Sequence, residues 1–163
     1  MQATKPNSNR PDSAEDTAAC RNSALNALAR REHSRLELER KLGARGYAAD
    51  VIGSTLDALE SAGLLDADRF TDSFVRSRQM RGHGPARIRR DLTERGIDAE
   101  RAGLALTQSN EDWRALARSV RQRKFGPDIP QAYKERAKQM RFLQYRGFSS
   151  EHIRAALESD TDD

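Results

Sequence analysis

Apolar residues recur along this chain at the three- and four-residue spacing of amphipathic helices. Three such groups in the first sixty residues predict three helices: Leu25, Leu28 and Ala29; Leu36, Leu38 and Leu42; and Val51, Ile52, Leu56 and Leu59. Alternating apolar and polar runs are absent, glycine and proline are scarce, and alanine, leucine, arginine and glutamate are abundant. We therefore expect no sheet.

One six-residue motif occurs three times. Leu42-Gly43-Ala44-Arg45-Gly46-Tyr47 is matched at positions 92–97 and 143–148, at periods of 50 and 51 residues. A leucine, an arginine and a glycine that must turn left-handed predict the end of a helix, and an acidic residue four positions after the glycine suits the start of the next one. The repeated corner predicts an all-α fold of three tandem three-helix repeats that form an elongated, curved array.

The repeats are expected at residues 21–64, 65–109 and 110–158. Residues 1–20 are polar and lack a helical period, which predicts a disordered tail, and residues 159–163 form an acidic end. Cys20, the single cysteine, falls in the predicted tail, so neither an internal disulfide nor a cysteine zinc site is expected.

The second and third repeats carry their own helix signals. The apolar sets are Phe70, Phe74 and Val75; Ile88 and Leu92; Ala102, Leu104 and Leu106; and Trp113, Leu116, Ala117 and Val120. Pro85 is expected to begin a helix after the break at residues 82–84, and an inserted loop at 126–130 precedes a helix from about Gln131 to Arg146. The predicted N-caps are Ser34, Asp98, Asn110 and Ser149.

Positive charge is concentrated in the second and third repeats. The formal net charge is +4, yet residues 76–95 hold seven Arg against two acids, and residues 113–146 hold ten Arg and Lys against two. One basic stripe ends at Phe125 and consists of Arg114, Arg118 and Arg121. A second ends at Tyr145 and consists of Lys134, Lys138 and Arg141. Both lie beside the apolar stripe of their helices. Such a distribution favours an anionic polymer or an acidic protein surface, with the aromatic rings available to stack on bases.

The candidate partner- and DNA-binding residues are Arg76, Arg78, Arg81, Arg87, Arg114, Arg118, Arg121, Lys124, Lys134, Lys138 and Arg141. A solvated helix face remains an alternative for either stripe. On the helix from Pro85, the pairs Arg87 with Asp91 and Arg90 with Glu94 can simply stabilise that helix.

Catalytic chemistry is not indicated. His33, His83 and His152 lie far apart and lack the spacing of a metal site, and the first two hold matching repeat positions that suit a turn. No nucleophile motif or Gly-rich phosphate loop is present. We expect no enzyme activity, cofactor or metal, and a soluble, cytoplasmic protein, because no apolar stretch approaches the length of a membrane span.

The second repeat resembles the central signature of the RecX family. The resemblance rests on Leu65-Asp66-Ala67-Asp68-Arg69-Phe70-Thr71, followed by Arg76, Arg78, Gly84, Ile88, Leu92 and Arg95-Gly96-Ile97. It covers residues 21 to about 158, and the tandem repeats, size and basic charge are similar too. Family members commonly have Asn or Asp where this chain has Asp66, and Ala where it has Thr71, which does not disturb the helix start.

The resemblance implies a regulator that binds RecA and its nucleoprotein filament and inhibits ATP hydrolysis, strand exchange and co-protease activity. Our hypothesis for the mechanism is that the curved array lies in the filament groove as a monomer, with the basic faces of the second and third repeats toward DNA phosphates or acidic RecA surfaces. It implies at most weak binding to single- or double-stranded DNA alone. Reversing Arg118, Arg121 and Lys138 is expected to weaken filament binding. Two alternatives stay open: an autonomous DNA-binding protein that inserts the helix of residues 85–95 into the major groove, and a helical adaptor for a partner protein.

Overall fold

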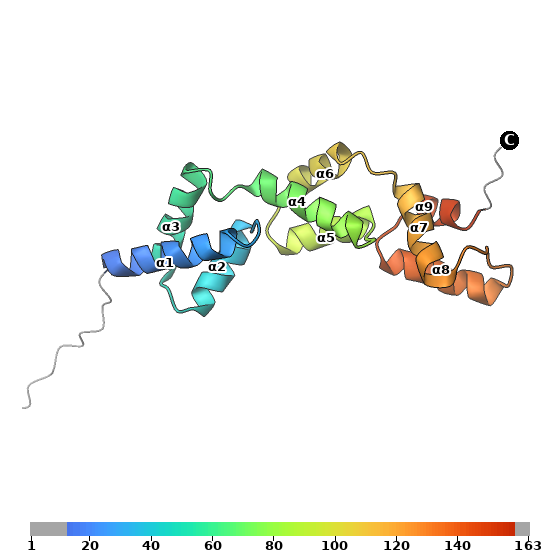
Figure 1. The fold of residues 1–163 in the computed structure, drawn as a ribbon, viewed down its shortest axis with the longest axis horizontal. Coiled ribbons are helices and arrows are strands. Elements are labelled where there is room, and N and C mark those ends of the chain that lie inside the picture. The colour runs from blue at the N-terminus through green and yellow to red at the C-terminus, as the bar shows by residue number, and fades with distance from the viewer. Residues whose placement is uncertain (1–12, 159–163) are drawn as a thin grey trace, which may run out of the picture. The chain divides into compact units, whose positions relative to one another are not determined.

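The computed structural model describes residues 13–158, and this part of the chain contains helices and no strands. The helices are α1 (Ser13–Leu28), α2 (Arg35–Ala44), α3 (Ala49–Ser61), α4 (Ala67–Met80), α5 (Pro85–Glu94), α6 (Ala99–Gln108), α7 (Trp113–Phe125), α8 (Tyr133–Tyr145) and α9 (Ser150–Ala156). Figure 1 shows them in three groups of three, which we call the first, second and third modules. The predicted all-α repeat fold is confirmed; the curvature of the array stays a prediction.

The chain divides into two compact units, residues 1–67 and 68–163. The first unit holds the first module, in which α1, α2 and α3 pack against each other around Leu38, Leu42, Leu56 and Leu59. The second unit holds the second and third modules. No helix in residues 13–158 is long and apolar enough to cross a membrane.

The predicted end of the tail at residue 20 is wrong. Helix α1 already begins at Ser13, and Cys20 is fully buried in the first core beside Ala24 and Ala27. The apolar face of α1 is built from these small residues, while Leu25 and Leu28 are only partly buried and Ala29 is exposed. Small residues among polar neighbours give only a weak helical period of hydrophobicity, so the sequence did not predict this buried face. The remainder of the predicted tail, residues 1–12, lies outside the described residues, as does the predicted acidic end.

The repeated motif forms the predicted helix-ending corner in all three modules. The glycines at 46, 96 and 147 have φ values of +91°, +79° and +96°, the left-handed region where a side chain is strained. In each corner the N–H of the apolar residue after the glycine donates to the carbonyl of the motif leucine, at 3.4, 3.0 and 3.2 Å. This is the hydrogen-bond pattern of a Schellman motif, and it satisfies a carbonyl that the helix end would leave unpaired.

Most of the predicted helix starts are confirmed. The Ser34 hydroxyl accepts from the N–H of Glu37, whose carboxylate accepts from the Ser34 N–H, which completes a capping box. Asp98 and Ser149 cap α6 and α9 through their side chains, and Pro85 is the first residue of α5.

The predicted cap at Asn110 is wrong. The carboxylate of Asp112 accepts from the N–H of Ala115 at 3.0 Å and starts α7, whereas Asn110 lies in the preceding turn with a φ of +51°. Asparagine tolerates the left-handed region, so it serves the turn here and the aspartate serves the helix.

The second module packs Phe70, Val75, Ile88 and Leu92 into its core, together with Ala102 and Leu106. Leu104 was expected to be buried with these residues but is 56% exposed, because its position on α6 faces away from the buried Ala102, Ala105 and Leu106. The third core joins residues of α7, α8 and α9: Ala117, Val120, Leu143, Phe148, Ile153, Ala156 and Leu157.

Candidate partner interface

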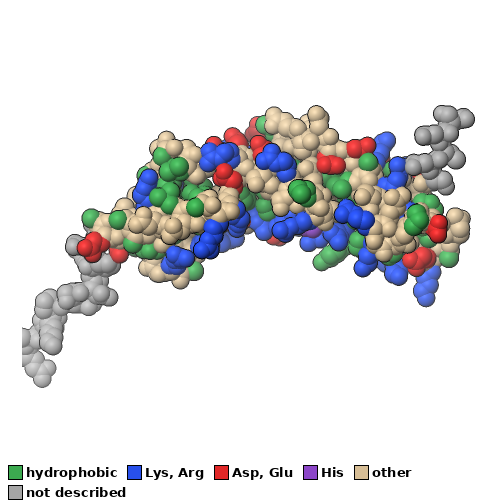
Figure 2. Space-filling model, viewed as in Figure 1, with side chains coloured by type: hydrophobic (Ala, Val, Ile, Leu, Met, Phe, Trp, Pro, Cys, Tyr) green, Lys and Arg blue, Asp and Glu red, His purple; other side chains and the backbone are tan. Residues whose placement is uncertain are grey.

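The basic side chains of the second unit are the candidate binding residues, and Figure 2 shows Lys and Arg along the lower edge of this unit. The structure gives the eleven predicted residues three different environments. Seven are exposed: Arg76, Arg81, Arg114, Lys124, Lys134, Lys138 and Arg141. Three are half-buried, Arg78, Arg87 and Arg118, and one is buried, Arg121. The interface can therefore use only part of the predicted set.

The basic stripe of α7 faces α9 and is largely used inside the third module. Arg114 forms an ion pair with Glu151, and the Nη2 atom of Arg118 donates to the carbonyl of Ala155 at 3.4 Å. Helices α7 and α9 form the most extensive helix pair of the fold. We expected this stripe to lie beside the packed face, open to a partner. That expectation is wrong for Arg121, which is buried.

Arg121 is fully buried and holds the loop between α7 and α8. Its guanidinium donates to the carbonyls of Pro127 and Asp128 at 3.1 and 3.0 Å, and more weakly to that of Gly126. It also donates to the Oε1 atom of Gln139, itself buried, at 3.3 Å. Burial, and then the charge of Arg118, lower the pKa of Arg121. Arg121 is thus a structural residue, and we remove it from the interface.

Two arginines of the second module enclose an aromatic ring. The guanidinium carbons of Arg78 and Arg95 lie 4.6 and 4.8 Å from the ring centroid of Phe74. Arg78 also lies 3.9 Å from the carboxylate of Asp91, the predicted partner of Arg87. Burial and the neighbouring Arg95 lower the pKa of Arg78. These cation–π contacts stabilise the module and leave Arg78 little freedom to bind a partner.

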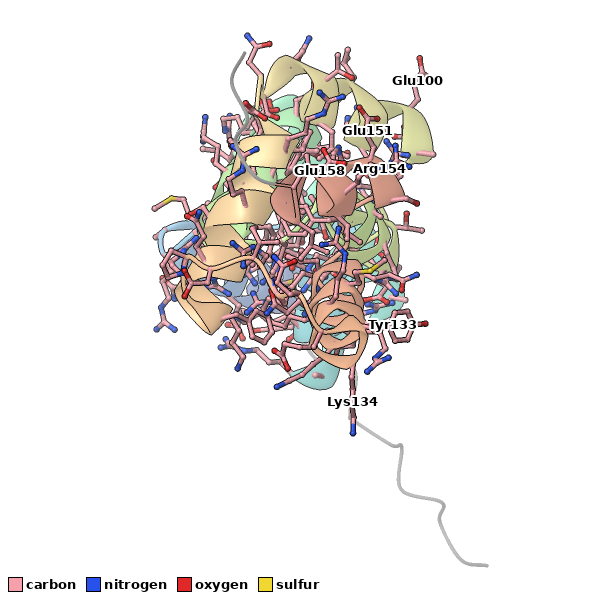
Figure 3. All side chains as sticks on the ribbon, turned by 90° about the vertical axis from the view of Figure 1, so that its right-hand side faces the viewer. Glu100, Tyr133, Lys134, Glu151, Arg154 and Glu158 are labelled. Carbon is pink, nitrogen blue, oxygen red and sulfur yellow. The ribbon has the colours of Figure 1, made fainter. Side chains whose placement is uncertain are left out.

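The stripe on α8 remains open. Lys138 is exposed, lies 3.8 Å from the carboxylate of Glu135, and has its ammonium 5.8 Å from the centroid of the Phe125 ring. Figure 3 shows Lys134 pointing outward from the start of α8, as Tyr133 also does. The α8 stripe therefore agrees with the predicted exposed basic face.

A cluster of four cations lies around Phe142 and was only partly expected. A cleft of about 220 Å³, which we call the Phe142 cleft, is lined by Arg81, Val120, Arg123, Lys124, Phe142 and Arg146. Lys124 and Arg146 lie over the Phe142 ring at 5.9 and 5.3 Å from its centroid. No carboxylate lines this cleft, so the four cations favour an anionic group. Arg123 and Arg146 were not among the residues predicted from the sequence, because the spacing of the stripes omits Arg123, and Arg146 belongs to the helix-ending motif.

The end of α8 docks directly on the start of α5. The N–H groups of Gly84 and Ala86 donate to the carbonyls of Arg146 and Gly147 at 2.8 and 3.1 Å. A Cβ atom on Gly84 would lie 2.4 Å from the backbone of Gly147, and one on Gly147 would lie 2.5 Å from the backbone nitrogen of Arg87. We call this contact the glycine clasp. It pairs unbonded N–H groups at one helix start with unbonded carbonyls at another helix end, so the two helices cap each other.

The three histidines serve turns and caps. His33 and His83 each precede the N-cap of the second helix of their module, as the sequence analysis predicted. The His152 ring accepts from the backbone N–H of Ser149 in the capping box of α9. Within residues 13–158, no group of three His, Cys, Asp or Glu side chains is arranged to hold a metal ion.

The fold and the charge together define a tandem three-helix repeat protein with a basic surface on its second unit. Three family models match successive parts of the chain: RecX, first three-helix domain, at residues 20–59; RecX, second three-helix domain, at 68–106; and RecX, third three-helix domain, at 110–157. Together they span most of its length. The chain belongs to the RecX family.

Similar proteins agree with this assignment. The chain is 44% identical over 145 residues to the regulatory protein RecX of Halorhodospira halophila, covering 89% of this chain and 90% of the relative. It is 48% identical over 135 residues to that of Pseudomonas entomophila, covering 83% and 87%. The crystal structure of RecX from Lactobacillus salivarius matches with a TM-score of 0.72 at 25% identity, covering 88% of this chain and 95% of that one. The relatives are named regulatory proteins, which indicates a non-enzymatic role.

Proposed function

We propose that this protein binds RecA recombinase and its nucleoprotein filament and inhibits ATP hydrolysis, strand exchange and co-protease activity. Membership of the RecX family supports a RecA-related partner. A cytoplasmic monomer that makes a weak, salt-sensitive contact with DNA is part of the same proposal.

The Phe142 cleft is the observation that carries the proposal. Its four basic side chains come from two modules, with Arg81 from the second and Arg123, Lys124 and Arg146 from the third. Arg146 also donates to the carbonyl of Arg81 at 3.0 Å, which ties the two sides of the cleft together. A fixed group of cations without a carboxylate among them suits DNA phosphates or acidic side chains on a RecA surface.

The mechanism that we propose is occlusion of the filament groove. An array that lies in this groove denies a second duplex access and hinders the subunit motions that accompany ATP turnover. Because the contacts would be spread over several cations, no single substitution is expected to abolish binding. The α8 stripe would add Lys134, Lys138 and Arg141 to those of the cleft.

The test is DNA-dependent ATP hydrolysis by RecA, titrated with this protein and with a variant of the cleft. The variant is Arg81→Gln, Arg123→Gln and Lys124→Gln, which removes three exposed charges and retains Arg121 and Arg146. The matched control changes three exposed cations of the first module: Arg30→Gln, Arg40→Gln and Lys41→Gln. Both variants lose the same net charge.

The proposal expects inhibition by the wild-type protein and by the control, and at least about tenfold more of the cleft variant for the same inhibition, since 1.4 kcal/mol of lost binding is tenfold. Equal weakening in both variants would show that net charge, and not the cleft, governs binding. No inhibition by the wild-type protein, combined with tight sequence-dependent binding to naked duplex, would favour the autonomous DNA-binding alternative.

A further inference from the structure

The glycine clasp holds together a second surface, which shares only Arg141 with the interface of the proposed function. Where α5 meets α8, a groove of about 520 Å³ is lined by Arg87, Arg90, Asp91, Glu94, Arg141, Gln144 and Tyr145. We call it the α5–α8 groove. One wall comes from the second module and the other from the third. Its shape therefore depends on the clasp, which permits no side chain at either glycine without moving backbone.

Among the corner glycines, Gly147 has the additional role of forming the clasp with the second module. Gly46 holds the same place in the first corner, and a Cβ atom there would meet no atom within 4 Å. In the second module, Gly84 also replaces the side-chain cap that Ser34 provides in the first. The N–H groups of Gly84 and Ala86 donate instead to the carbonyls of Arg146 and Gly147, in the corner that follows α8. These two departures from the repeat occur together, at the place that builds the groove.

Tyr145 is the aromatic residue of the groove, and its ring is largely exposed. It is 76% exposed at the end of α8, and the guanidinium carbon of Arg87 lies 5.6 Å from its ring centroid. A large exposed aromatic ring loses favourable burial unless it contacts a partner. The arginine limits the motion of the ring, and most of the ring remains open to solvent.

The charges around the ring suit a ligand with few phosphates. Arg141 lies one helical turn before Tyr145 on α8, and Arg90 lies one turn after Arg87 on α5. Asp91 and Glu94 also line the groove, so its cations do not form a uniform track for a phosphate backbone. An exposed ring that shares a groove with two exposed arginines suits one base and its flanking phosphates.

We propose that the α5–α8 groove binds an unpaired nucleic-acid strand, with a base stacked on Tyr145 and phosphates held by Arg90 and Arg141. A duplex hides the faces of its bases, so it would leave the ring without a partner. The inference deepens the proposed contact with DNA and rests on it, but it does not depend on inhibition of RecA. It assigns that contact to a strand type and to particular residues.

The test measures binding of the full chain to fluorescent oligo(dT) and to a duplex of the same length by anisotropy, without RecA. Tyr145→Ala is expected to weaken binding to oligo(dT) about tenfold or more, since stacking on one base has that effect, while Tyr145→Phe retains it. Tyr133→Ala is the control: Tyr133 is 87% exposed on the same helix and lies outside the groove. Both tyrosines are exposed, so neither change should unfold the protein.

A salt titration and a crosslink complete the test. Two phosphate contacts to a single strand predict a slope of about −1.4 in log affinity against log salt, reduced by about half in Arg141→Gln. Oligo(dT) that carries one 5-iodouracil should photocrosslink to Tyr145, located by peptide mass spectrometry.

Unchanged oligo(dT) binding by Tyr145→Ala, or tighter binding of duplex than of oligo(dT), would overturn the inference. A crosslink confined to the Phe142 cleft would overturn it as well. RecA inhibition measured on the same samples separates the two proposals. Inhibition that persists without any binding of oligo(dT) refutes the groove and leaves the proposed regulation of RecA in place.

Discussion

Replacing Arg121 should lower the stability of the third module, and this loss should occur without any partner present. The side chain is 0% exposed, and its guanidinium donates to three carbonyls of the α7–α8 loop and to Gln139. In Arg121→Glu a carboxylate would face these oxygens without a donor, and an uncompensated buried charge costs about 3–5 kcal/mol. Arg121→Met should cost about 2–3 kcal/mol, because the loop carbonyls are near the surface and can bind water instead.

The assay is urea unfolding followed by the fluorescence of Trp113, the only tryptophan, which packs against the third core. With a slope of about 2 kcal/mol per molar urea, Arg121→Met should lower the midpoint by about 1–1.5 M, and Arg121→Glu by more. Arg123→Glu is the control, since Arg123 is exposed two positions along the same helix, and its cost should stay below about 1 kcal/mol. Equal midpoints for Arg121→Glu and Arg123→Glu would refute the structural role of Arg121.

Three further predictions concern the corners, the caps and pH. Gly147→Ala should cost at least about 2 kcal/mol more than Gly46→Ala in urea unfolding, because both strain a left-handed residue but only the first forces its Cβ into the backbone of Arg87; equal losses would mean that the clasp is unimportant. Ser34→Ala should cost about 1 kcal/mol through loss of the capping box, and an unchanged midpoint would contradict that role. Burial, and then the charges of Arg87, Arg78 and Arg146, lower the pKa of His83 to about 4, so the folded protein binds fewer protons than the unfolded chain between pH 4 and 6.5. Stability should therefore fall by about 2 kcal/mol from pH 7 to pH 5 through this residue, and His83→Gln should flatten that part of the pH profile; an unaltered profile would show that His83 does not cause it.

The features that local sequence determines were predictable. The corners and the caps at Ser34, Asp98 and Ser149 depend on residues within five positions of each other, and all were confirmed. The cap at Asp112 was missed because asparagine at 110 satisfies the same rule, and only the backbone conformation of the turn decides between them.

The features that distant contacts determine were not predictable. Arg121 fits a basic stripe by spacing, yet the loop that follows α7 folds back over it and Gln139 arrives from α8, 18 residues away. A residue's position on a helix face could not show that the neighbouring loop covers that face. The opposite error occurs at Cys20 and Ala24, which are buried although the sequence did not predict it. Their small side chains lie among polar residues, so the helical period of the buried face is weak.

The three corner arginines show how one repeated unit acquired different roles. Arg45 reaches back within its own module, where it donates to the Ser23 hydroxyl on α1 at 3.1 Å. Arg95 also stays within its module, stacked on Phe74 of α4. Arg146 instead crosses to the carbonyl of Arg81, beside the clasp that Gly147 forms with the second module. The third corner is therefore both a helix end and a joint, and this change explains why the second and third modules form one compact unit. Both surfaces proposed to bind a partner lie along that joint, where cations from the second and third modules come together.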